Sequence, residues 1–262
     1  MARNNMDAKL AKEILREVKK ADGKQAFDIA PQAYDFCYQY IVRGTGLSTD
    51  YLDEQKVRET HRVLSKRPGF PAAPSILDYG CGPGNAGPWL RKYFPDSPIY
   101  GVDISAKSVR IAKEKNEAIN ISYAAIDERG GDFPFDMQFD LIVVYNTFHH
   151  IAKREQPQVF LRIKALLNNG GLLVIHEMNP YNPVIAWVFH KYDTKNDPAA
   201  NILHPRYLRK QIAKAGLGVT RPYYELFFPG FLSALLPLEK HMTRVPFGAR
   251  YYVIAEHRGN SS

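Results

Sequence analysis

A glycine-rich turn constrains the fold of this chain more than any other feature. Residues 75–89 read S-I-L-D-Y-G-C-G-P-G-N-A-G-P-W, in which glycines alternate at positions 80, 82 and 84. The short apolar run before the turn predicts a buried parallel strand, and a helix is expected from about residue 85 to 94. Glycine permits positive φ angles and leaves no Cβ to hold a ligand away from the backbone. A strand, a glycine turn and a helix N-terminus together predict a nucleotide-binding edge.

The carboxylate of Asp78, just before the first glycine, separates this turn from a dinucleotide fingerprint. The spacing is G-x-G-x-G rather than G-x-G-x-x-G. An acid there would repel a pyrophosphate but attract an ammonium or sulfonium group. The stretch 78–84 resembles the D/E-x-G-x-G-x-G motif of class I S-adenosylmethionine-dependent methyltransferases. The resemblance implies S-adenosylmethionine as cofactor, S-adenosylhomocysteine as product, and a cofactor site that includes Asp78, Gly80, Cys81, Gly82 and Gly84. The alternative is a tight turn that holds no ligand.

Acids follow the next two expected strands as well. Strand 98–103 ends in Asp103, 19 residues after Gly84, close to the ~20-residue offset at which such folds place a carboxylate for ribose hydroxyls. Ile104 is expected to pack on the purine. Strand 121–126 ends at Ile126, before Asp127, and the resemblance implies an acid here that accepts from the adenine amine. Asp132 is the alternative, and Asp127 is favoured because it directly follows the strand.

The fourth expected strand, residues 138–146, leads into a histidine pair. Its apolar centre predicts burial on both faces, and its carboxyl end should face the ligand crevice. The resemblance implies that Tyr145 and Asn146 contact the cofactor. His149 and His150 are the candidate catalytic bases, because a histidine titrates near physiological pH. The alternative is that these histidines only begin a helix and are held there by backbone hydrogen bonds. A metal site is not expected, because no third metal ligand lies nearby in the sequence.

The chain divides into an expected helical cap, residues 1–70, and a methyltransferase domain, residues 71–262. The segment F-D-I-A-P-Q-A-Y-D, at 27–35, resembles the lid of small-molecule methyltransferases, and core packing of an aromatic helix is its alternative. Acceptor contacts are expected from Tyr34, Asn179 and Tyr181. The stretch E-M-N-P-Y-N-P, at 177–183, resembles a bacterial subgroup of class I methyltransferases that has no defined substrate. Apolar insertions at about 180–200 and 227–246 are interpreted chiefly as core, with an acceptor pocket or a membrane surface as alternatives.

Composition and charge limit the classes of binding partner and cellular location that we expect. The chain has 262 residues, 45% of them hydrophobic, and a net charge of +8, but Lys and Arg form no block and no N/D-P-P-Y/F motif occurs. Nucleic acid is therefore not the expected partner. Two cysteines indicate no disulfide framework. Without a signal-like N-terminus or a run of ~20 apolar residues, we expect a soluble cytoplasmic protein, with peripheral membrane contact left open. Acceptor identity and oligomeric state are not predicted.

Alternating strands and helices predict the fold class: a Rossmann-like, doubly wound α/β sheet of seven mostly parallel strands with a final antiparallel strand, and helices on both faces. The expected activity is methyl transfer to an oxygen or nitrogen of a small molecule, such as a sugar or a lipid-like metabolite. Holding the reactants in line and general-base help would supply the acceleration. A catalytically silent cofactor-binding scaffold is one alternative. An NAD-dependent oxidoreductase is another, against which the glycine spacing and Asp78 argue.

Overall fold

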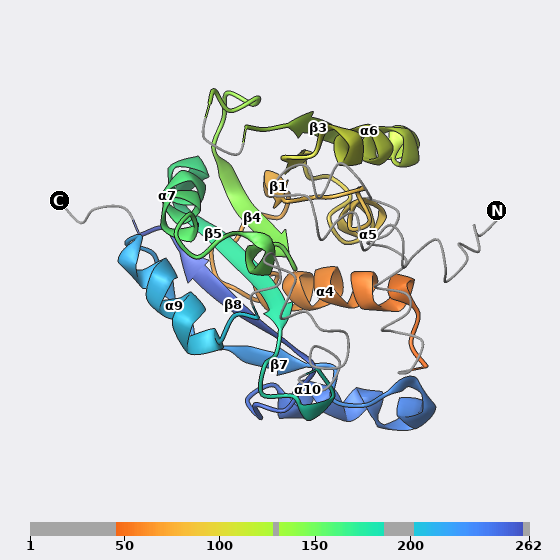
Figure 1. Cartoon of the computed structure of the whole chain (residues 1–262). Coiled ribbons are helices and arrows are strands. Elements are labelled where there is room, and N and C mark those ends of the chain that lie inside the picture. The colour runs from red at the N-terminus through yellow and green to blue at the C-terminus, as the bar shows by residue number, and fades with distance from the viewer. Residues whose placement is uncertain (1–45, 128–130, 186–201, 259–262) are drawn as a thin grey trace, which may run out of the picture.

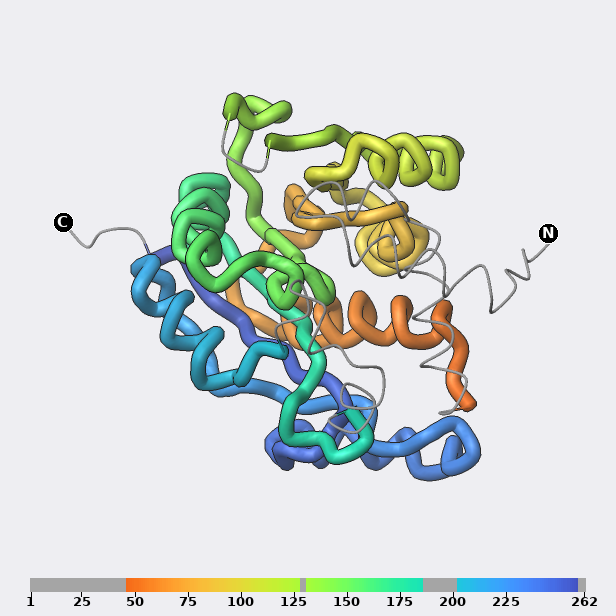
Figure 2. The backbone as a smooth tube through the Cα atoms, viewed as in Figure 1, coloured from red at the N-terminus to blue at the C-terminus, as the bar shows by residue number. Residues whose placement is uncertain are grey.

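The computed structural model describes residues 46–127, 131–185 and 202–258. Figure 1 shows a central twisted sheet with helices packed against it, and Figure 2 follows the same path as a tube. Tyr34, the expected lid segment and most of the first apolar insertion lie outside the described residues.

The sheet has the order β3-β2-β1-β4-β5-β8-β6, and β7 also pairs with β8. Strands β1 to β5 are parallel, and β8 runs antiparallel to its neighbours β5, β6 and β7. The strand order reverses beside β1, so β1 and β4 flank the crevice at which open α/β sheets bind ligands. The strands are Ile76–Tyr79 (β1), Ile99–Asp103 (β2), Ser122–Ala125 (β3), Phe139–Tyr145 (β4), Leu167–Met178 (β5), Gly218–Val219 (β6), Tyr223–Glu225 (β7) and Arg250–Glu256 (β8).

Helices cover both faces of the sheet (Figure 1). Apolar side chains of α4 and α5 form one core layer with one face of the sheet, and those of α7 and α9 form the other. Along β4, Ile142 and Val144 join the α7 and α9 side, whereas Leu141, Val143 and Tyr145 join the α4 and α5 side. The α-helices are Thr49–Leu64 (α4), Gly87–Tyr93 (α5), Ala106–Lys115 (α6), Gln156–Leu166 (α7), Pro205–Lys214 (α9) and Glu239–Met242 (α10), and short 3₁₀ helices span Glu117–Ile119 (η1), Phe148–His150 (η2) and Gly230–Leu238 (η4).

The predicted fold class is confirmed, with one difference in strand number. The described sheet has eight strands, because residues 218–225 form two short strands, β6 and β7, rather than one. Pro222 lies between the two and cannot donate to a strand ladder. β5 begins directly after α7, so residues 168–171 belong to the start of this strand.

No helix among the described residues is long and apolar enough to cross a membrane. The expectation that the second insertion is core is wrong for η4, because none of its residues is buried. Its side chains lie on the surface of the molecule.

Candidate functional site

The three glycines of the turn have different roles. Gly80 has a φ of +80°, and a Cβ there would lie 2.4 Å from Cγ2 of Thr147, so the turn can pack against the end of β4 only without a side chain. Gly84 likewise lies against Asn116, the C-cap residue of α6, and the Asn116 side-chain amide donates to the Gly84 carbonyl at 2.9 Å. At Gly82, with a φ of +51°, a Cβ would meet no atom within 4 Å. Gly82 is therefore where the backbone is open to a ligand.

The carboxylate of Asp103 is held at the end of β2 by the glycine turn itself. Its Oδ2 accepts from the Gly82 amide and its Oδ1 from the Ser105 amide, both at 2.9 Å. Ser105 also caps α6, accepting from the Ser108 amide. A carboxylate only accepts hydrogen bonds, so a ligand that meets Asp103 must offer a donor such as a hydroxyl group.

Two buried oxygens at the ends of β1 and β4 have no hydrogen-bond partner within the described part of the chain. They are Oδ1 of Asp78 and Oδ1 of Asn146. Asn146 also has a φ of +53°, a conformation that costs energy in a residue other than glycine and is concentrated at functional sites. Because buried polar atoms are nearly always hydrogen-bonded, two orphan acceptors on adjacent strands indicate a missing donor, such as an ammonium group.

Burial dominates the electrostatics of Asp78. It raises the pKa of this carboxyl from 3.8 to about 7, Lys56 lowers it, and Asp103 adds to the rise. Lys56 comes from α4 and is itself buried, with its Nζ 2.6 Å from Oδ1 of Asp53 and 5.4 Å above the centroid of the Tyr145 ring. A cation thus lies near the acids at this edge, and it comes from α4, in the segment expected as a cap.

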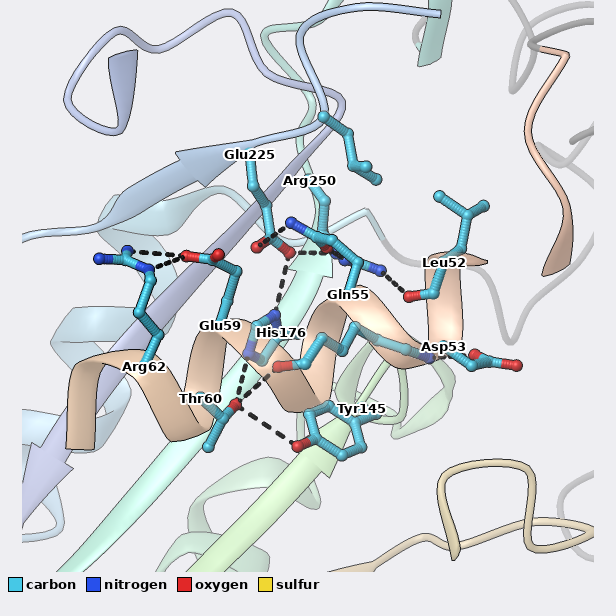
Figure 3. A network of polar contacts seen from close by, with 12 residues as sticks. Leu52, Asp53, Gln55, Glu59, Thr60, Arg62, Tyr145, His176, Glu225 and Arg250 are labelled. Atoms are coloured by element: carbon cyan, nitrogen blue, oxygen red, sulfur yellow. Dashed lines mark hydrogen bonds and ion pairs between the residues drawn. The ribbon is translucent and has the colours of Figure 1, made fainter. Parts of the chain in front are cut away.

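A buried polar network connects α4 to the last strands of the sheet (Figure 3). Oε1 of Glu225 contacts Nε of Arg250 and lies 3.1 Å from Nδ1 of His176. Burial opposes ionisation of Glu225, but Arg250 and His176 outweigh it and lower the pKa of Glu225 to about 2. Burial lowers the pKa of His176, and the neighbouring Glu225 opposes this change.

The same network fixes the side chain of Tyr145. Its hydroxyl donates to Oγ1 of Thr60 at 3.4 Å, and Thr60 lies 3.1 Å from Nε2 of His176. Burial raises the pKa of the Tyr145 phenol. The ring therefore supports α4, whereas the Tyr145 carbonyl accepts from Thr147 beside the glycine turn.

Both members of the histidine pair lie in η2, directly after β4. Nδ1 of His149 lies 2.7 Å from Oε2 of Glu177 at the end of β5, and the other oxygen of Glu177 accepts from the Phe148 amide at 2.8 Å. The His149 and His150 rings are 3.9 Å apart. A carboxylate can only accept, so Nδ1 of His149 carries a proton, and Nε2 is the ring nitrogen left to take up a second one. Such an arrangement suits a general base.

The remaining predicted cofactor residues follow β2 and β3. Ile126 is buried in the core, Ile104 packs against the same cluster, and Asp127 and Asp132 are exposed. The Asp127 carbonyl accepts from Arg162 of α7 at 3.0 Å. Burial raises the pKa of the Cys81 thiol well above its usual value, so this cysteine offers its backbone rather than a nucleophile.

The two predicted acceptor residues after β5 differ in environment. Asn179 is fully buried, and its amide donates to the Pro246 carbonyl at 3.0 Å and the Gly248 carbonyl at 2.7 Å. Its Oδ1 accepts from the Tyr181 amide. Asn179 therefore joins two loops in this structure, whereas the Tyr181 ring is exposed and lies 5.5 Å from that of His204. Their assignment to the acceptor stays a prediction.

Sequence reasoning missed Lys56 and Glu177. Asp53 and Lys56 are three residues apart on a helix, a pattern typical of an exposed ion pair, and nothing local marks them as buried. For Glu177, the one local signal of a functional role was its position directly after His176, near the end of an expected strand. Among the described residues, no group of three His, Cys, Asp or Glu side chains could hold a metal ion.

Comparisons with known proteins agree with this geometry. Residues 76–171 match the family model described as "Methyltransferase domain". The chain is 29% identical over 126 residues to trans-aconitate 2-methyltransferase of Paracidovorax citrulli, covering 47% of this chain and 45% of the relative. It is 26% identical over 123 residues to cyclopropane-fatty-acyl-phospholipid synthase of Escherichia coli K12, covering 47% of this chain and 30% of the relative. The chain thus spans less than half the length of these curated relatives.

Solved structures extend the likeness to nearly the whole chain. The plantazolicin methyltransferase BpumL, in complex with a triazolic desmethylPZN analogue and S-adenosylhomocysteine, aligns with a TM-score of 0.62 and 16% identity, over 96% of this chain and 100% of that one. Magnesium protoporphyrin IX methyltransferase from Synechocystis PCC 6803, with bound S-adenosylhomocysteine, aligns with a TM-score of 0.53 and 16% identity, over 94% of both chains. At these identities the likeness shows the fold.

Proposed function

We propose that this chain, which belongs to the class I S-adenosylmethionine-dependent methyltransferases, transfers a methyl group to an oxygen or nitrogen of a small-molecule acceptor. The family match and the fold support the class. The single observation that carries the activity is the pair of orphan acceptors, Asp78 and Asn146, beside the open backbone of Gly82. This arrangement suits a ligand that carries an ammonium group.

The residues at the crevice fit S-adenosylmethionine. Asp78 and the Asn146 amide oxygen would accept from its ammonium group, and Lys56 offers a buried positive charge for its carboxylate. Asp103 would accept from the ribose hydroxyls, while Gly82 leaves room along the backbone. Ile104, Ile126 and Asp127 are the residues proposed for the adenine end.

When bound, the cofactor supplies an electrophilic methyl group on a sulfonium. The chain's own residues then hold the acceptor in line with that group, which supplies most of the acceleration. His149 takes the acceptor's proton at Nε2 where the acceptor must lose one. Glu177 is a positioning residue, because its hydrogen bond at Nδ1 fixes the tautomer and stabilises the imidazolium. His150 packs against His149 and is the second candidate base.

The acceptor is proposed to be a small molecule, in keeping with relatives named for trans-aconitate and for fatty-acyl phospholipid. A ribosomal RNA methyltransferase also occurs among the relatives, but the spread of Lys and Arg argues against nucleic acid. Tyr34, Asn179 and Tyr181 are proposed for the acceptor side. We assign the methyltransferase domain to residues 71–262 and a cap to residues 1–70, although α4 packs into the core of the sheet.

Calorimetry of the purified chain with S-adenosylhomocysteine and, separately, with NAD tests the cofactor. We expect binding of the first ligand only. Incubation of the chain with isotope-labelled S-adenosylmethionine and a cell extract, followed by mass spectrometry, should then find labelled methyl in the small-molecule fraction. Binding of NAD without S-adenosylhomocysteine would favour an oxidoreductase. Slow cofactor hydrolysis without any methylated product would favour a silent scaffold.

A further inference from the structure

A surface segment between β7 and β8 exposes large apolar side chains that the site does not use. It comprises residues 226–249 and includes η4 and α10, at the lower edge of the molecule in Figure 1. Phe231 is 77% exposed, Leu238 51% and Phe247 61%. Leu232, Leu235 and Val245 are also exposed. Several large apolar side chains exposed within one short segment indicate an interaction site.

The loop after β5 extends this surface. Tyr181 and Val184 are both exposed, and the Asn182 amide donates to the Phe247 carbonyl at 2.6 Å, which ties the loop to the segment. We call residues 181–184 and 226–249 together the apolar rim. Two hydrogen bonds from Asn179 to the segment's backbone hold the same junction.

The charged side chains at the surface of the apolar rim are positive. Its only acid, Glu239, is turned inward and accepts from the backbone amides of Leu226, Phe227 and Phe228, at distances of 2.7 to 3.2 Å. Lys240 and Arg244 are exposed, and the Arg244 guanidinium lies 3.8 Å over the ring of Tyr223. Apolar side chains bordered by cations, with the acid withdrawn, complement an anionic lipid surface.

The topology places the apolar rim at the edge of the sheet that carries the candidate site. β7 runs in the same direction as β5, because both are antiparallel to β8. The segment that follows β7 and the loop that follows β5 therefore leave the sheet at its carboxyl edge. The glycine turn after β1 and the histidine pair after β4 leave at the same edge.

We propose that the apolar rim docks this protein on an anionic membrane surface, with the carboxyl edge of the sheet turned toward the lipid. Phe231, Leu235 and Leu238 enter the interfacial region, and Lys240 and Arg244 lie at the level of the headgroups. Docking itself does not depend on the proposed methyl transfer. If both hold, a lipid-like acceptor would reach the site directly from the membrane.

Sedimentation with sucrose-loaded vesicles of phosphatidylcholine, with and without phosphatidylglycerol, tests the proposal. We expect the full chain to partition onto the anionic vesicles and to be released by salt, which screens the attraction. Leu238→Ser should lower the partition coefficient about tenfold. Leu161→Ser is the matched control, since Leu161 is 49% exposed on α7 outside the rim, and should leave partitioning unchanged. Lys240→Gln should lower it about fivefold.

Thermal melts by circular dichroism confirm that each variant folds. Equal binding of the Leu238→Ser and Leu161→Ser variants, or no binding of the wild type to anionic vesicles, would overturn the proposal. Light scattering in solution tests whether a second copy of this chain, rather than a membrane, covers the apolar rim. A dimer that Leu238→Ser dissociates would show that a second copy covers the rim, and would also overturn it. Because vesicle binding needs no cofactor, failure here leaves the proposed methyl transfer untouched.

Discussion

The Asp78→Asn substitution separates stability from ligand binding in this protein. Asp78 is buried with one oxygen that has no partner among the described residues, and burial raises its pKa to about 7. We expect the variant to be more stable than the wild type without ligand, because it removes a buried charge that the fold compensates only in part. The same variant should bind S-adenosylhomocysteine more weakly.

The magnitude and its sign follow from the pKa change. A carboxyl whose pKa rises from 3.8 to about 7 on folding opposes folding when ionised, by at most about 4 kcal/mol. The cost is absent below the unfolded pKa, grows as pH rises, and is complete above the folded pKa. The gain from Asp78→Asn should therefore be near zero at about pH 3.5 and largest at about pH 8.

Urea unfolding followed by circular dichroism measures this gain across pH. Asp96→Asn is the control, because Asp96 is exposed before β2, and should change stability little at any pH. Calorimetry should find that Asp78→Asn weakens S-adenosylhomocysteine binding about tenfold to a hundredfold. Binding of 5′-methylthioadenosine, which lacks the amino-acid group, should not change. An Asp78→Asn gain that is absent at about pH 8, or constant with pH, would refute the reasoning.

Three further substitutions test the neighbouring side chains. Lys56→Met should weaken S-adenosylhomocysteine binding about tenfold and leave 5′-methylthioadenosine binding unchanged; equal losses for both ligands in calorimetry would contradict a carboxylate partner. Glu177→Gln should slow methyl transfer to the identified acceptor tenfold or more with cofactor affinity kept, and adding His149→Ala should cost little more. Glu225→Gln should destabilise the fold by about 3 kcal/mol at neutral pH by leaving Arg250 unpaired. Because the pKa of Glu225 is lowered to about 2, that loss should shrink in urea titrations as pH falls from about 4.5.

The order of elements could be predicted from sequence because its signals are local. The alternation of apolar strands and amphipathic helices, and the glycines at 80, 82 and 84, gave the fold class and the ligand edge. The position of Asp103 after a strand likewise follows from spacing. The strand division at Pro222 had a local signal in the proline itself. The surface position of η4 was not predictable, because an apolar run reads the same whether it packs inward or lies on the surface.

The sequence by itself determined the glycine turn, since glycine readily adopts positive φ angles and allows the close approach of Thr147 to Gly80 and of Asn116 to Gly84. Tertiary structure alone decided which charges act there. Lys56 and Asp78 are 22 positions apart, and Glu177 meets His149 only because β4 and β5 are neighbours. A pKa depends on burial and on charges brought near by the fold, so no spacing along the chain could reveal it.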